Sequence, residues 1–260
     1  MSYVIAFYGL KDGQGLTTSA LGIAAELARR HSVLFLDADM SGTGTAADCL
    51  QVDPAGRGMQ NLIGSRAITA ADLVGQAVST RMHSLGVVPG LMGVCGSSVQ
   101  RLVDQLREGQ AFAVPGLQFL VVDFGTVVHP EQRSLRQAVG SIATIAHRVF
   151  TVVRDDPPLL ARAVQVLRAA APPKTELLLM ESRRGALRKQ VAEVLRLRVP
   201  EVAVAATISW DPPKAWAAMD AGRPLGRGGL VRQLQLAERA GPVLAEVDAM
   251  PAAGAAGAAG

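Results

Sequence analysis

The sequence predicts an α/β protein whose doubly wound, mostly parallel sheet is flanked by helices. Apolar runs of strand length alternate with segments of helical period along most of the 260 residues. Hydrophobic residues make up 49% of the chain, which suits a sheet that is buried on both faces. We therefore expect one domain over residues 1–247 and a disordered, Ala/Gly-rich tail over residues 248–260.

The first predicted strand leads directly into a glycine-rich turn. The apolar run Tyr3–Tyr8 is typical of a buried strand, and a helix with apolar residues at helical spacing follows the turn. The glycines and hydroxyl residues of the turn are Gly9, Gly13, Gly15, Thr17 and Thr18. Glycines let backbone N–H groups close around an anion, and the start of a helix adds partial positive charge. The stretch Tyr3–Thr18 therefore predicts a phosphate-binding loop.

This loop resembles the deviant Walker pattern K-G-G-x-G-K-T-[TS] of the ParA/MinD family of P-loop ATPases. Lys11 stands at the family's early signature lysine, whereas Leu16 stands where the phosphate-binding lysine belongs and Asp12 replaces a glycine. The loop has lost one cation that would face the phosphates and gained one anion nearby. Both changes oppose the binding of a polyanion. The resemblance thus implies a P-loop NTPase fold with a degenerate ATP site.

A second predicted strand, His31–Asp37, ends in an acidic pair. Asp37 and Asp39 match the two carboxylates of the family's D-x-D-P-x-G motif, which in the family act around Mg²⁺ and the attacking water. The alternative is an Asp pair that caps the following turn or helix. The phosphate-binding loop one helix upstream favours the site over the cap.

The middle of the chain holds a second candidate acidic position. The predicted elements are a helix at Thr69–Val78, a strand at His83–Pro89, a helix at Val99–Glu108 and a strand at Leu117–Asp123. The last of these has the form of a Walker B strand, and Asp123 matches its acidic residue, which supports a metal or the hydrolytic water. An apolar strand that ends in Asp is also common in any α/β protein.

The C-terminal half continues the alternation of strands and helices. The predicted elements are strands at His147–Val153, Thr175–Met180 and Val202–Ile208 and a final amphipathic helix at Leu230–Val247, interrupted near Gly241 and Pro242. The segment Ile208–Leu225 is similar to a closing segment of the family, and its acidic residue, Asp211, is assigned to nucleotide binding by the resemblance. The adenine-reading Asn of the family is absent from Leu179–Ser182.

The resemblance implies ATP or ADP with Mg²⁺ as cofactors and a homodimer as the working assembly. The implied phosphate cradle is the backbone around Gly13, Gln14, Gly15, Leu16, Thr17 and Thr18. Thr17 would ligate Mg²⁺, with Asp37 and Asp123 around the metal. Lys11 would reach the phosphates from the opposing protomer, and Asp39 would orient the attacking water.

Degenerate loops of this kind are typical of a branch similar to TadZ and CpaE, whose members localise pilus or secretion machinery at a cell pole. We therefore expect a positioning protein with weak ATP binding, slow or absent hydrolysis and a protein partner from such a system. One alternative is a non-hydrolysing pseudo-ATPase scaffold. Another is a DNA-partitioning ATPase, for which Arg183–Lys189, Arg223, Arg227 and Arg232 could supply a basic surface.

Composition restricts the remaining choices. The net charge of +4 comes without a dense basic run, so contact with nucleic acid is not favoured. No apolar run reaches the ~18 residues of a membrane span. The apolar face of Leu230–Val247 is expected to pack on the sheet, so peripheral membrane contact is not favoured either. Cys49 and Cys95 have no metal-ligand spacing, and we expect reduced thiols in a cytoplasmic protein that is recruited to the inner membrane face or a pole.

Overall fold

The computed structural model describes residues 1–40, 45–92, 99–126, 132–170, 175–181, 188–209 and 211–249. One eight-stranded sheet forms its centre, in the order β3-β4-β2-β5-β1-β6-β7-β8. The strands are β1 (Tyr3–Gly9), β2 (Val33–Asp37), β3 (Val78–Ser79), β4 (Leu85–Val88), β5 (Phe119–Thr126), β6 (Arg148–Arg154), β7 (Thr175–Glu181) and β8 (Ala203–Ser209). All neighbouring pairs are parallel except β3 and β4, so the predicted doubly wound sheet is confirmed.

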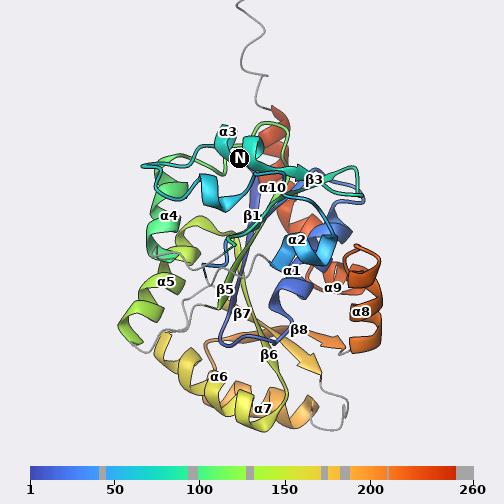
Figure 1. Cartoon of the computed structure of the whole chain (residues 1–260). Helices are drawn as coiled ribbons and strands as arrows, with labels where there is room; N and C mark the ends of the chain where they lie inside the picture. Colours follow the sequence, from blue (N-terminus) through green and yellow to red (C-terminus); the bar gives the residue numbers. More distant parts are fainter. Residues whose placement is uncertain are drawn as a thin grey trace, which may run out of the picture.

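Helices cover both faces of this sheet (Figure 1). They are α1 (Leu16–Leu27), α2 (Thr45–Leu50), α3 (Ala70–Gln76), α4 (Val99–Glu108), α5 (Gln132–Ile145), α6 (Pro157–Ala170), α7 (Arg188–Arg198), α8 (Pro212–Asp220), α9 (Gly228–Gln233) and α10 (Leu236–Ala249), with a 3₁₀ turn at Met59–Asn61. Buried residues of α4–α7 form one core with the sheet, and those of α1, α2, α9 and α10 form the other. The two cores lie on opposite faces because strand side chains alternate: Val4 and Ala6 join the first core, Ile5 and Phe7 the second.

The order of the strands brings the candidate site together. β1 lies between β5 and β6, and β5 pairs with β2 on its other side. Because parallel strands end at the same edge of a sheet, the loop after β1 lies beside the ends of β2 and β5. The register places Asp37 of β2 directly opposite Asp123 of β5, and Gly9 of β1 opposite Thr126.

The final helix differs from the sequence prediction. Two helices replace the single Leu230–Val247 segment, because Gln235 adopts a left-handed conformation (φ 52°) that ends α9. Pro242 lies inside α10 rather than interrupting it. The buried residues Leu236 and Ala240 pack on the sheet and hold this helix despite the lost backbone bond. The apolar face expected to pack on the sheet does so, since Leu230 is buried in the same core.

The tail and the surface add little to the site. The expected tail begins at residue 248, whereas α10 runs to Ala249, and residues 250–260 lie outside the described part of the chain. Cys49 is a buried free thiol, as expected, while Cys95 lies outside the described residues.

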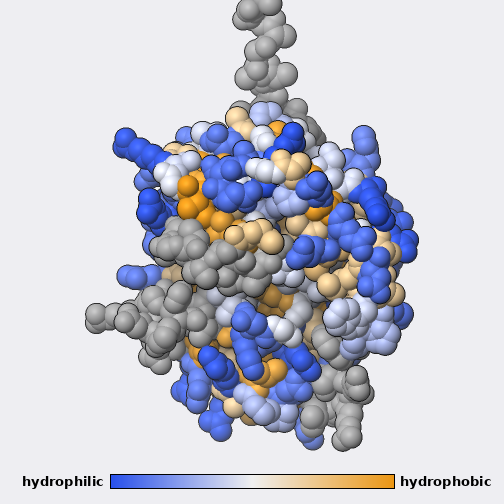
Figure 2. Space-filling model, in the orientation of Figure 1, coloured by the Kyte–Doolittle hydropathy of each residue, from blue (hydrophilic) through white to orange (hydrophobic). Residues whose placement is uncertain are grey.

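Within the described ranges, none of the helices has the length and apolar character to cross a membrane. Figure 2 shows hydrophilic side chains over most of one face, with apolar ones in small separate areas.

Candidate functional site

The turn after β1 has the backbone of an anion-binding loop. Gly13 (φ 74°) and Gly15 (φ 79°) both adopt left-handed conformations that favour glycine. Gly15 is the residue before α1, and no side chain caps that helix. A Cβ on Gly15 would lie 2.8 Å from Cε of Met180, so the side chain of Met180 at the end of β7 packs directly against this glycine. The uncapped N–H groups at the start of α1 are therefore available to a phosphate.

Leu16, at the position where the resemblance expects a phosphate-facing lysine, has a side chain that belongs to the core. Leu16 is only 8% exposed and joins the buried cluster between α1 and the sheet. One of its methyl groups lies 3.3 Å from the position of a Cβ on Gly9. The residue also lines the cavity in front of the loop, where it presents apolar surface in place of a charge.

Asp12, the second departure, is joined to the end of β5. The hydroxyl of Thr126 donates a hydrogen bond to Oδ1 of Asp12. The same Thr126 oxygen lies 3.2 Å from the position of a Cβ on Gly9, so Thr126 is packed on the loop as well as bonded to it. The end of β5 thus holds the loop in place by a hydrogen bond to Asp12 and by packing against Gly9.

The carboxylates of Asp37 and Asp123 lie on neighbouring strands and are buried; Asp37 ends β2, whereas β5 continues past Asp123 to Thr126. Asp37 accepts hydrogen bonds from the backbone N–H of Ala46 (3.0 Å) and of Asp39 (3.3 Å). Burial raises the pKa of Asp37 to about 6. Its carboxyl carbon would lie 2.6 Å from a Cβ on Gly90, which explains the glycine after β4. Asp37 therefore also caps the start of α2, as the alternative reading of the sequence expected.

Asp123 is fully buried, and its hydrogen bonding is incomplete. Oδ1 accepts a hydrogen bond from the N–H of Gly125 (2.9 Å), whereas Oδ2 has no partner within the described ranges. Burial raises the pKa of Asp123 to about 7, and the neighbouring Asp37 charge adds to this shift, while the Thr17 hydroxyl opposes it. A buried carboxylate oxygen without a partner, close to a hydroxyl at the start of α1, suits a hydrated Mg²⁺ that these side chains would share.

A cavity of about 260 Å³ opens in front of the loop. Of the residues chosen from the sequence, the cavity is lined by Lys11, Gly13, Gly15, Leu16, Thr17, Thr18 and Asp39. Lys11 is exposed, and the side chain of Asp39 packs against Gly125. The described part of the chain holds no group of three His, Cys, Asp or Glu side chains arranged to bind a metal. A metal here would need phosphate or water oxygens among its ligands.

Other residues chosen from the sequence lie elsewhere. Asp211 accepts a hydrogen bond from the N–H of Lys214 (3.2 Å) and pairs with its Nζ (2.7 Å), so it caps α8 and does not line the cavity. Gln14 is buried, and its Oε1 has no partner among the described residues. Thr45 and Thr126 also line the cavity, and neither is among the site residues predicted from the sequence. Thr126 follows Asp123 closely, but only the extension of β5 past Asp123 turns it toward the loop.

Solved structures, but no sequence relatives, identify the fold of this chain. No family model matches the chain, and no curated protein matches it by sequence. The fold is similar to a MinC:MinD cell division protein complex from Aquifex aeolicus, at 16% identity over 96% of this chain and 98% of that chain (TM-score 0.65). The septum site-determining protein MinD with Mg-ADP from Pyrococcus horikoshii OT3 is also similar, at 17% identity over 96% and 100% (TM-score 0.64).

A third similar structure is a ParA family ATPase from Chlorobium tepidum TLS. It shares 15% identity over 96% of this chain and 100% of that chain, with a TM-score of 0.58. The chain therefore has the P-loop fold of the MinD and ParA proteins, as the loop and the order of motifs predicted.

Proposed function

We propose that this chain is a ParA/MinD-like positioning or assembly protein with a weakened site for Mg²⁺ and ATP or ADP. The observation that carries the proposal is the uncapped start of α1 behind two left-handed glycines, next to the buried carboxylates of Asp37 and Asp123. The fold supports the same class, since it is shared with MinD bound to Mg-ADP. We further propose a cytoplasmic protein, recruited to the inner membrane face or a pole by a pilus or secretion system, as in the TadZ/CpaE branch.

In the proposed site, different residues would bind the phosphates, the metal and the attacking water. The backbone N–H groups from Gly13 to Thr17 and the dipole of α1 would bind phosphate oxygens. The Thr17 hydroxyl would ligate Mg²⁺, with Oδ2 of Asp123 accepting a hydrogen bond from a metal-bound water. The bound metal supplies positive charge that offsets the phosphates. Asp39, which lines the cavity, would orient a water toward the terminal phosphate.

Two side chains weaken this site. A charge-assisted hydrogen bond contributes about 1.5–3 kcal/mol, and Leu16 cannot make one. Asp12 adds a carboxylate at the mouth of the cavity. Each 1.4 kcal/mol is a factor of ten in affinity, so the missing lysine alone weakens phosphate binding by about 10–100-fold.

Lys11 offers a replacement for the missing cation. It is exposed at the mouth of the cavity, where it can contact a second protomer placed over the site. In a homodimer, Lys11 of each protomer would approach the phosphates bound by the other. Nucleotide would then stabilise the dimer, and the dimer would bind the partner protein.

The second candidate function is a scaffold that binds no nucleotide. The burial of Leu16 and the Asp12–Thr126 hydrogen bond favour it, because both hold the loop in place without a ligand. Such a protein would keep the fold for docking to partners alone.

Molar mass by light scattering, with and without Mg-ATP, tests the proposal. We expect a shift from monomer toward dimer with Mg-ATP at millimolar concentration, lost in Lys11→Ala and kept in Lys214→Ala. Lys214 is an exposed lysine on α8 and serves as the matched control. An unchanged mass at saturating nucleotide would reject the switch and favour the scaffold.

A further inference from the structure

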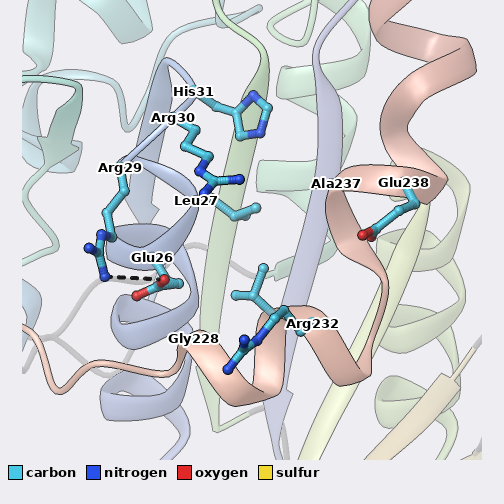
Figure 3. Close-up of a pocket in the computed structure, with 10 residues that line it drawn as sticks. Glu26, Leu27, Arg29, Arg30, His31, Gly228, Arg232, Ala237 and Glu238 are labelled. Carbon is cyan, nitrogen blue, oxygen red and sulfur yellow. Dashed lines mark hydrogen bonds and ion pairs between the residues drawn. The ribbon is translucent and has the colours of Figure 1, made fainter.

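A hollow of about 620 Å³ lies at the C-terminal end of α1, at the other end of this helix from the glycine loop. It is bounded by the last turn of α1, by α9 and by the start of α10 (Figure 3). Figure 3 shows Arg30 and Glu238 pointing into the hollow from opposite sides. Apolar side chains of Leu27 and Val231 also line it.

A smaller hollow of about 180 Å³ adjoins the first. The two share Glu26 and Arg29 among their lining residues, so they lie side by side, and we treat them together as one depression. The smaller one is mostly apolar, lined by Leu50, Met82 and Pro224. Arg81 and Arg223 also line it, and both are exposed. An apolar hollow bordered by cations therefore lies beside a larger, more polar one.

Positive charge dominates this depression. Its arginines are Arg29, Arg30, Arg81, Arg223 and Arg232, and we call them the arginine surface. Its acidic residues are Glu26, which pairs weakly with Arg29 (3.5 Å), and Glu238. Across the described ranges, Arg30, Arg223 and Arg232 have neither an ion pair nor a hydrogen bond from their side chains. Guanidinium groups without a carboxylate partner are available to an anionic ligand.

We propose that the arginine surface docks an acidic segment of another protein, with an apolar side chain of that segment in the smaller hollow. Arginine forks match carboxylates bidentately and are enriched at protein interfaces. The smaller hollow is lined mostly by apolar side chains, which suit an apolar side chain of the partner. A nucleic-acid backbone has no such group. Glu26 and Glu238 lie among the arginines and would repel any anion placed next to them, so the choice of a protein segment over a duplex rests on the apolar hollow.

This surface is separate from the proposed nucleotide site. It shares no lining residue with the cavity at Gly15 and Asp39. The proposal therefore stands or falls independently of nucleotide binding.

Fluorescence anisotropy with a labelled octapeptide EDELEDLE tests the proposal at about 50 mM salt, where surface charges are screened less than at physiological salt. We expect Arg30→Glu/Arg232→Glu to weaken binding at least tenfold, since two attractive charges become repulsive. Arg162→Glu/Arg168→Glu makes the same change in net charge on α6, against the other face of the sheet, and should change affinity less than twofold. The peptide EDESEDSE, without leucine, should bind at least threefold more weakly.

Three outcomes would overturn the proposal. The first is equal binding by wild type and Arg30→Glu/Arg232→Glu, or an equal loss in the α6 control. The second is equal affinity for the peptides with and without leucine, which would leave only general charge attraction. The third is tighter binding of a 20-base-pair DNA duplex with the same dependence on Arg30 and Arg232. Unchanged Mg-ADP binding in the variant and a wild-type circular dichroism spectrum would show that fold and nucleotide site are intact.

Discussion

The side-chain charges at both ends of α1 follow the helix dipole, but they have opposite consequences for an anionic ligand. The N-terminal end has partial positive charge, and Asp12 and Asp39 line the cavity there beside the uncharged Leu16, so these side chains suit the dipole but not a bound phosphate. The C-terminal end has partial negative charge, and Arg29 and Arg30 lie there as the dipole favours. The backbone at the N-terminal end still suits an anion, so in the proposed site the side chains, not the fold, would weaken binding.

The largest expected effect comes from restoring the side chains at the N-terminal end. Leu16→Lys/Asp12→Gly adds a phosphate-facing cation and removes an anion, which should tighten Mg-ADP binding at least 100-fold by calorimetry. Leu197→Lys/Asp220→Gly makes the same change in net charge at exposed positions of α7 and α8 and should leave the affinity unchanged. Equal gains in the two variants would mean that net charge alone governs binding.

The buried carboxylates predict an unusual dependence of stability on pH. Burial raises the folded-state pKa of Asp37 to about 6 and of Asp123 to about 7, above the ordinary value near 4. The folded state thus binds more protons than the unfolded state between pH 4 and 7. The contribution of these groups to stability is fully present below pH 4 and is lost as the pH rises through 6 to 7.

Asp123→Asn isolates this effect, because the amide cannot ionise. The variant should be more stable than wild type at pH 8 by about 2–4 kcal/mol, with the difference shrinking toward pH 5. Urea unfolding of both proteins at both pH values measures the difference. A constant difference between wild type and Asp123→Asn across this range would mean that Asp123 keeps an ordinary pKa.

Gly15→Ala tests whether the backbone conformation of the loop before α1 requires glycine. The left-handed φ of 79° and the 2.8 Å approach of Met180 both oppose a Cβ, so we expect a loss of about 1–3 kcal/mol in the free energy of unfolding. Gly140→Ala, in α5 with open space around it, should instead be neutral or stabilising by up to about 1 kcal/mol. Similar changes in both variants would contradict the tight packing of β7 on the loop.

The smallest expected effect concerns the bond between the loop and β5. Thr126→Val removes the hydroxyl that donates to Asp12 and should lower the free energy of unfolding by about 0.5–1 kcal/mol. A double-mutant cycle with Asp12→Asn should give a coupling of at least about 0.5 kcal/mol. Strictly additive losses would show that the two side chains do not interact in solution.

The sequence could predict the fold because hydrophobic period and strand ends are local signals. The run Tyr3–Tyr8 and the acidic residues Asp37 and Asp123 placed β1, β2 and β5, although β5 continues to Thr126 and does not end at Asp123. Parallel pairing then brings the three strands together at one edge of the sheet. The site was only partly predictable. The role of Asp211 as a helix cap depends on α8, and the contact of Thr126 with Asp12 joins residues far apart in the chain.

The split of the final helix was missed for a related reason. Gly241 and Pro242 are the strongest breakers in that segment, yet α10 continues through them because its apolar face packs on the sheet. The break falls at Gln235, which has no local signal for a left-handed residue. Tertiary packing overrode the local preference in both places.

Titration of the wild-type protein with Mg-ADP in a calorimeter tests the central claim most directly. The backbone of the loop has the conformation that binds phosphate, but Leu16 provides no positive charge. We therefore predict weak, saturable binding of Mg-ADP, with an affinity roughly 10–100-fold below that of Leu16→Lys. Binding by wild type as tight as by Leu16→Lys would contradict the claim that Leu16 weakens the site. Absence of binding in both proteins would contradict the claim that the loop still binds phosphate.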